Sequence, residues 1–221
     1  MKELLKKNLS FFVPYFTFLS VSFILILSYE KAELHILSNE INNHFLDYFF
    51  KFVTNLGDGV MIAVLAVILL FVKYRYSIAF VVGSLVTSGV VQLLKKVVLH
   101  DIYRPSKYFE LYETYHLHFV EGVNLHSLHS FPSGHSATAF NIFLMLALIF
   151  KNQTLKVLFI LSAVVVAYSR VYLSQHFLID ITVGSLFGVL ITLVVFWWST
   201  KWRNEWFEKS LIELFISPHD K

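Results

Sequence analysis

The sequence lacks cysteine altogether and has few charged residues. Without cysteine the chain can form neither a disulfide nor a metal site with thiolate ligands. Charged residues make up only 15% of the 221 residues, whereas 57% are hydrophobic and the mean hydropathy is +0.65. Such a composition is too apolar for a soluble domain of this length, so the sequence predicts a polytopic membrane protein.

The sequence also lacks a stripe of basic residues. Its net charge is only +3, and its lysines and arginines are scattered among the apolar runs. We therefore expect no nucleic-acid partner. No feature of the sequence indicates an obligate protein partner, and none predicts an oligomeric state.

Six apolar runs have the composition of membrane helices. They cover about residues 9–29, 59–72, 77–96, 131–150, 155–173 and 177–198. The first run does not end in a small-residue cleavage site, so we expect a retained helix and not a signal peptide. We predict an all-α fold: a single membrane-embedded domain over residues 1–221, with six transmembrane helices in a bundle.

Three segments lie outside these runs. Residues 45–56 carry apolar side chains at helical spacing, which predicts a helix in the membrane interface or the start of the second transmembrane helix. Residues 97–131 form a long polar, aromatic and His-rich loop between helices three and four, and loops of this length are often functional. Residues 201–221 mix aromatic and charged residues, typical of an amphipathic tail on the membrane surface.

The distribution of lysine and arginine predicts the orientation of the chain. With six spans both termini lie on one side, and the segments on that side carry 11 of the 18 basic residues. By the positive-inside tendency the termini are cytoplasmic and the His-rich loop is extracytoplasmic. In a bacterium this places the loop at the periplasmic face of the cytoplasmic (inner) membrane.

The third predicted helix has a polar seam. Ser84, Ser88 and Gln92 follow each other at four-residue steps, which suits close packing inside a bundle. At 100° per residue Lys95 projects within the arc of this seam, whereas Lys96 falls outside it. We therefore expect Lys95 to face the interior.

The stretch from Ser169 to Asp180 sets an Arg, a His and an Asp between two apolar runs, where polar side chains are costly without a function. His176 and Asp180 stand four residues apart and share a helix face. The carboxylate can take the proton of one ring nitrogen and leave the other free to attack, which describes an oriented nucleophile. The alternative is a pair that merely caps the next helix.

Two further segments meet this stretch at the same predicted membrane face. Arg104 and Arg170 can grip phosphate oxygens in bidentate fashion, and Lys95 adds a point charge. Phosphoryl transfer depends on such positioning and on neutralising the oxygens of the transferred group. The three cations therefore favour a phosphate site.

The run Pro132 to His135 opens the fourth predicted helix. Pro132 suits a first turn, and Ser133, Gly134 and His135 are expected to present free N–H groups at the positive end of the helix dipole. Gly134 allows close approach of a phosphate. His135 supplies a second imidazole that can protonate a leaving alkoxide and then activate water. The alternative is a simple N-cap.

These motifs resemble the signature of the type 2 phosphatidic acid phosphatase superfamily over residues 95–180. Pro-Ser-Gly-His matches in full at residues 132–135, and Ser-Arg, five residues, His, three residues, Asp matches at Ser169, Arg170, His176 and Asp180. In the remaining motif, Lys followed by Arg-Pro, eight residues separate the lysine at position 95 from Arg104, where six are common. Lys96 therefore stays open as the phosphate-binding lysine.

The resemblance implies a lipid phosphatase without metal or cofactor. His176 attacks phosphorus to form a phosphohistidine, Asp180 orients it, and His135 acts as general acid and then base. The residues implied to hold the phosphate are Lys95, Arg104, Ser133, Gly134 and Arg170. The family acts on lipid phosphates in the bilayer at the outer membrane face: undecaprenyl diphosphate, phosphatidylglycerophosphate, phosphatidic acid and the phosphates of lipid A. The sequence does not indicate which lipid this chain uses.

Three alternatives stay open. A phosphotransferase of the same family would differ only in the acceptor that replaces water. A metal-dependent hydrolase could use the outer-loop histidines, which otherwise shape the substrate entrance: His100, His116, His118, His126 and His129. A transporter would fit six spans, but the charged residues cluster at one face and not in mid-membrane.

Overall fold

The structure, a computed structural model, describes residues 1–215, and this part of the chain contains helices and irregular segments but no strand. The all-α prediction is therefore confirmed. Residues 216–221, the end of the predicted surface tail, lie outside the described residues. The helices are α1 Lys2–Lys7, α2 Leu9–Ser28, α3 Lys31–Asn39, α4 His44–Val53, η1 Thr54–Gly57, α5 Gly59–Leu70, α6 Tyr74–Leu93, η2 Leu94–Val98, α7 Pro105–Tyr112, α8 Gly134–Ile149, α9 Gln153–Tyr172, α10 Leu178–Ser199, η3 Glu205–Glu208 and α11 Ile212–Phe215.

Four helices of the described chain are long and apolar enough to cross a membrane: α2, α6 continued by the π-helical turn η2, α9 and α10. The segment of α4 and η1 passes this test only together with α5, from which it is bent by 55° at Asp58. α8 is apolar but has only 16 residues. The structure thus gives four candidate spans, or five with the bent pair, and the predicted count of six also requires α8.

Residues 45–56 form a helix, but α4 does not lie apart from the bundle. It packs on α9 through Phe50, whose ring centroid is 4.5 Å from that of Tyr172. It also exposes aromatic side chains, with Phe45, Tyr48 and Phe52 each 74% exposed. Both predicted roles are compatible with this arrangement, because η1 joins α4 to α5 but the two helices are bent by 55°.

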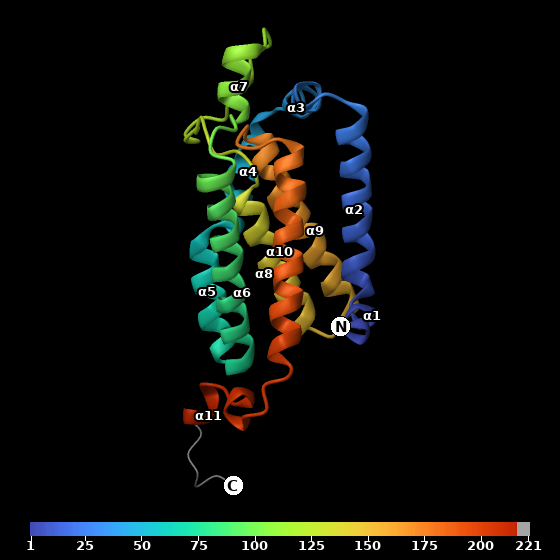
Figure 1. The fold of residues 1–221 in the computed structure, drawn as a ribbon, viewed down its shortest axis with the longest axis vertical. Coiled ribbons are helices and arrows are strands. Elements are labelled where there is room, and N and C mark those ends of the chain that lie inside the picture. Colours follow the sequence, from blue (N-terminus) through green and yellow to red (C-terminus); the bar gives the residue numbers. More distant parts are fainter. Residues whose placement is uncertain (216–221) are drawn as a thin grey trace.

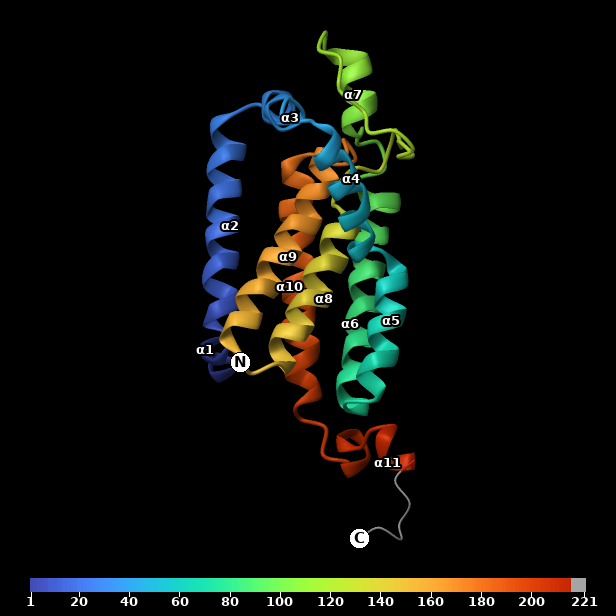
Figure 2. The same cartoon turned by 180° about the vertical axis from the view of Figure 1, so that it is seen from behind.

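The bundle is organised around α8, which packs against α6, α9 and α10. Figures 1 and 2 show α5 and α6 side by side at one edge and α2 at the other. The short helices α3 and α7 lie at one end of the bundle, and α1 and α11 lie at the opposite end (Figure 1). Backbone hydrogen bonds of 2.9 Å, from Tyr74 N–H to the Lys209 carbonyl and from Leu211 N–H to the Leu70 carbonyl, hold the described part of the tail on the α5–α6 turn.

Two glycines let α10 approach α8 closely. A Cβ atom at Gly184 would lie 2.5 Å from the carbonyl oxygen of Ser133, and one at Gly188 would meet the carbonyl oxygen of Ala137. Small residues at such a spacing allow helix backbones to pack against each other in a membrane. Gly184 therefore sets how far the start of α8 stands from α10.

Replacing Gly184 by alanine should force the two backbones apart. We expect the free energy of unfolding to fall by about 1–3 kcal/mol, as in other overpacked sites. Thermal unfolding in detergent measures this change. Gly59→Ala is the matched control, because a Cβ atom there meets no atom within 4 Å. Equal melting temperatures for the two variants would contradict the close approach.

Candidate active site

The predicted site residues gather at the end of the bundle where α3 and α7 lie (Figure 1). They come from the ends of several helices: Lys95 from η2, Arg104 from the residue before α7, Ser133 to His135 from the start of α8, Arg170 from the end of α9, His176 from the loop before α10 and Asp180 from the first turn of α10. Helix termini place polar groups at one depth while the apolar helix bodies pack below them. The structure therefore brings the three sequence motifs together.

The imidazole of His176 is buried and faces a carboxylate. Its Nδ1 atom lies 3.3 Å from Oδ2 of Asp180, and both residues are only 1% exposed. An ionised carboxylate only accepts hydrogen bonds, so Nδ1 carries the proton and the lone pair of Nε2 is available. The predicted pairing is present, although His176 lies just before α10 and not on the helix as we expected.

The carbonyl oxygen of Arg170 explains the fixed spacing between this arginine and the histidine. It accepts hydrogen bonds from Gln175 N–H at 2.9 Å and from His176 N–H at 3.1 Å. The end of α9 therefore fixes the backbone of the loop that carries the imidazole. The side chains of Arg170 and His176 are positioned by the same turn.

Asp180 makes more contacts than the sequence indicated. Its Oδ2 atom also accepts from Phe177 N–H at 2.9 Å, which caps α10, and from the Ser130 hydroxyl at 2.5 Å. Asp180 therefore caps α10 and also contacts the imidazole of His176, while its orienting role in a reaction stays a prediction. Sequence reasoning missed Ser130; its position just before the Pro132 motif was the only signal.

Ser130 anchors the outer loop as well, because its N–H donates to the Ile102 carbonyl at 3.1 Å. We expect Ser130→Ala to lower kcat about tenfold, since one hydrogen bond to a buried charged group is lost. KM should change little if Ser130 positions Asp180 and does not touch substrate. The test is to measure kcat and KM of Ser130→Ala on a lipid phosphate that the wild type hydrolyses. Ser130→Thr is the control, because it keeps the hydroxyl. Equal loss in both variants would contradict the positioning role.

The two arginines are held by neutral groups. Arg104 donates from Nε to the Leu128 carbonyl at 3.0 Å and from Nη1 to Oε1 of Gln175 at 3.0 Å. Arg170 donates from Nη1 to the Thr54 hydroxyl at 2.8 Å, while its buried Nε has no partner among residues 1–215. Within the same residues neither guanidinium forms an ion pair with a carboxylate. Gln175 and Thr54 are further contacts that the sequence did not indicate.

Lys95 and Lys96 differ in burial as the seam argument predicts. Lys95 is 8% exposed, whereas Lys96 faces outward. Both lie in the π-helical turn η2, Leu94–Val98. A π-helical turn contains more residues than an α-helical turn, which accounts for part of the longer spacing between the lysine and Arg104. Of the predicted seam, only Ser84 is buried, whereas Ser88 and Gln92 are exposed, so the expected close packing is wrong at those two positions. Phosphate binding by Lys95 stays a prediction.

The start of α8 differs from the expectation at one residue. The N–H of Ser133 is not free, because it donates to the Asp180 carbonyl at 2.9 Å. The Ser133 hydroxyl oxygen accepts from the N–H of Ser136 at 3.3 Å and from its hydroxyl at 2.9 Å, so Ser133 is also the N-cap. Its own hydroxyl proton is left to donate. No described residue accepts the N–H groups of Gly134 and His135.

Positive charge surrounds the nucleophile candidate. Burial, reinforced by Arg104, Lys95 and Arg170, holds the pKa of His176 well below its ordinary value. A neutral imidazole is the form that can attack phosphorus. The same cations would attract a phosphate dianion. The electrostatics thus favour both substrate binding and the reactive form of His176.

His35 of α3 is a second buried histidine at this end. It is 1% exposed, and its Nε2 lies 3.1 Å from the hydroxyl of Ser174, two residues before His176. Its ring lies between those of Phe109 and Phe177, at 5.6 and 5.4 Å between centroids. Burial lowers the pKa of His35 from 6.5 to about 4. The side chain is therefore neutral in the folded protein.

This shift predicts acid-sensitive stability. Below pH 6.5 the unfolded chain protonates His35 while the folded protein does not, so stability falls between pH 6.5 and pH 4 by up to about 3 kcal/mol. His35→Gln should remove that part of the pH dependence. Melting temperatures in detergent at pH 7.5 and pH 5 measure it, with the exposed His116→Gln as control. An unchanged pH dependence in His35→Gln would contradict the assignment.

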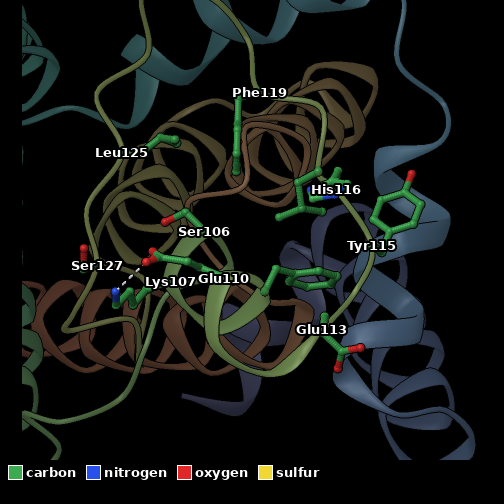
Figure 3. Close-up of a pocket in the computed structure, with 11 residues that line it drawn as sticks. Ser106, Lys107, Glu110, Glu113, Tyr115, His116, Phe119, Leu125 and Ser127 are labelled. Carbon is green, nitrogen blue, oxygen red and sulfur yellow. Dashed lines mark hydrogen bonds and ion pairs between the residues drawn. The ribbon is translucent and has the colours of Figure 1, made fainter.

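A cavity of about 520 Å³ lies in the outer loop, and none of the predicted site residues lines it. Figure 3 shows Lys107 and Glu110 paired on its wall, 2.9 Å apart, with His116 and Phe119 across from them. His118 is bound to Asp47 at 3.1 Å. Within residues 1–215 no three His, Asp or Glu side chains are grouped so as to hold a metal ion.

Comparison with known proteins finds similar sequences and similar structures. The family model of the PAP2 superfamily matches residues 60–204. The bacitracin transport permease protein BcrC of Bacillus licheniformis is 28% identical over 123 residues, which are 55% of this chain and 56% of that relative. The chain thus aligns with little more than half of this relative's length.

Two crystal structures share the fold. LpxE of Aquifex aeolicus superposes with a TM-score of 0.65 at 25% identity, over 77% of this chain and 94% of that one. A transmembrane PAP2 type phosphatidylglycerolphosphate phosphatase from Bacillus subtilis superposes with a TM-score of 0.61 at 22% identity, over 90% and 98%. The second likeness concerns the fold alone.

Proposed function

Because the chain belongs to the PAP2 superfamily, as its motifs predicted, we propose that it is a membrane lipid phosphatase that hydrolyses a phosphate monoester or a diphosphate of a lipid. The observation that carries the proposal is the buried His176–Asp180 pair, surrounded by cations without carboxylate partners among residues 1–215. The apolar helices, which are long enough to cross a bilayer, support a substrate that lies in the membrane.

In the proposed reaction Nε2 of His176 attacks phosphorus, and the bond from phosphorus to the lipid oxygen breaks. His135 gives a proton to a leaving alkoxide. His135 then takes a proton from water, the water oxygen attacks phosphorus, and the bond to His176 breaks to release inorganic phosphate. Lys95, Arg104 and Arg170 neutralise the phosphoryl oxygens, while Gly134 N–H and the Ser133 hydroxyl donate hydrogen bonds to them.

The position of His135 supports its role. It lines a cavity of about 170 Å³ between α5, α6 and α8, together with Thr87, Ser88, Gln92 and Asp58. His176 and Arg170 do not line this cavity. A lipid chain placed in this cavity would lie next to His135.

The proposed arrangement in the membrane has six spans. They are α2, the bent pair α4–α5, α6, α8, α9 and α10, with both termini cytoplasmic and the site at the periplasmic face of a bacterial inner membrane. The positions of α1 and α11 at one end of the bundle are consistent with an even number of spans (Figure 1). Reporter fusions after residue 203 and within residues 113–127 test this orientation. A periplasmic reporter at residue 203 would contradict it.

Phosphate release from a panel of lipid phosphates and diphosphates by detergent-solubilised protein tests the function. The proposed mechanism uses no metal, so release should persist with EDTA present. Arg104→Gln should lower kcat/KM about 100-fold or more, as loss of a charged group at a transferred phosphoryl does. No phosphate release from any lipid of the panel, or release only after metal is added, would overturn the proposal.

A further inference from the structure

A second cavity reaches the phosphate site from the side of α4 and has no role in the reaction above. Its volume is about 440 Å³. It lies between α4 with η1, the outer loop near Gly122, and the end of α9. The residues that line it are Tyr48, Lys51, Phe52, Thr54, Asn55, Gly122, Val123, Arg170 and Leu173. A neighbouring cavity of about 370 Å³ shares Tyr48, Lys51 and Gly122 with it.

Arg170 is a buried member of this lining. The side chain is 8% exposed, and its Nε atom has no hydrogen-bond partner among residues 1–215. A buried guanidinium nitrogen without a partner is costly, so a ligand oxygen is expected to accept from it. The arginine therefore connects the cavity to the site of the transferred phosphoryl group.

Lys51 brings a second positive charge to the same cavity. Its Nζ donates to the Glu121 carbonyl at 2.6 Å, and it forms no ion pair within the described chain. Its natural partner at i−4, Asp47, is engaged by the Tyr172 hydroxyl at 2.6 Å and by His118 at 3.1 Å. Lys51 is exposed and carries no carboxylate partner among residues 1–215, so an anion that enters the cavity can reach its ammonium group.

The backbone makes room for this lysine. Gly122 has a φ of +72°, and a Cβ atom there would lie 2.7 Å from the Nζ atom of Lys51. Glycine thus allows the ammonium group to lie against the outer loop. Tyr48 and Phe52, each 74% exposed, present aromatic surface beside the lysine. An anion held here would lie at the boundary between apolar surface and the phosphate site.

From these contacts we infer that the cavity lined by Lys51 and Arg170 is a second anion subsite, which binds a phosphate group next to the one that is transferred. The inference rests on the proposed function and names the chemistry of its substrate or product. The group has two possible sources. It can be the second phosphate of a diphosphate, or a separate inorganic phosphate ion on its way out.

Calorimetric titration of the detergent-solubilised protein with inorganic pyrophosphate and with orthophosphate tests the subsite without requiring turnover. The variants are Lys51→Gln and, as a matched lysine at the same end of the bundle, Lys107→Gln. Wild type should bind pyrophosphate more tightly than orthophosphate. Lys51→Gln should weaken pyrophosphate about five- to tenfold, the effect of one charge-assisted hydrogen bond at a partly exposed site, while Lys107→Gln leaves it unchanged.

Each outcome is decisive. Selective weakening of pyrophosphate assigns the subsite to a diphosphate, whereas loss of a second orthophosphate binding event assigns it to a separate phosphate ion. Equal binding of both anions by wild type and Lys51→Gln, or the same loss in Lys107→Gln, would overturn the subsite. A protein that binds these anions as expected but releases no phosphate from any lipid would contradict the proposed function alone.

Discussion

Replacement of His176 by alanine should abolish phosphate release, with a fall in kcat of about 10⁴-fold or more, because it removes the Nε2 atom that is proposed to attack phosphorus. The side chain is buried at the centre of the cations and is already hydrogen-bonded through Nδ1 to Asp180. Release of inorganic phosphate from the best lipid of the panel, measured with EDTA present, is the assay.

His116→Ala is the matched control for this experiment. His116 lines the outer-loop cavity and lies outside the proposed phosphate site (Figure 3). The control should keep wild-type activity. If His176→Ala retained more than about a tenth of the activity, or if His116→Ala lost as much, a nucleophilic His176 would be untenable and the outer-loop histidines would need to be tested as metal ligands.

Asp180→Asn should lower kcat about 10³-fold while the protein still folds. The carboxylate accepts three hydrogen bonds on one oxygen, from Ser130, Phe177 N–H and His176. An amide can satisfy some of these donors, but it removes the negative charge that stabilises the proton on Nδ1. His176 is then free to adopt the tautomer that cannot attack.

The measurement for Asp180→Asn is kcat with a thermal melt of the same preparation. Asp101→Asn, a change at an exposed carboxylate paired with His100, should leave kcat unaltered. A variant of Asp180 with a normal melting temperature and near-normal kcat would show that the carboxylate only caps α10. If Asp180→Asn loses both folding and activity, Asp180→Glu is the second variant, because it keeps the negative charge. Its kcat and melting temperature then show whether the charge is needed for catalysis or only for folding.

The sequence predicts the local parts of this site well. His176 and Asp180 are four residues apart, and Arg170 and His176 share one turn, so short spacing is enough to place them together. Lys95 could be distinguished from Lys96 because helical periodicity fixes which side faces the bundle. The apolar runs predicted the all-α class for the same reason: each run encodes its own helix.

The parts that the sequence could not predict depend on where distant segments meet. Ser130 reaches Asp180 only because the outer loop returns over α10, and Gln175 meets Arg104 through the same loop. The bend at Asp58 and the shortness of α8 left the count of spans open. The N–H of Ser133 was expected to be free, but α10 packs so closely on α8 that the Asp180 carbonyl accepts it.

The central claim is that His176 carries the phosphoryl group during turnover. Rapid mixing with a lipid substrate labelled at the transferred phosphate, a quench under denaturing conditions that preserve phosphohistidine, and peptide mapping test it directly. The account predicts a labelled, acid-labile phosphopeptide that contains His176 and forms within the first turnover, with EDTA present. Phosphate release without a phosphoenzyme, or a label on any other residue, would contradict it.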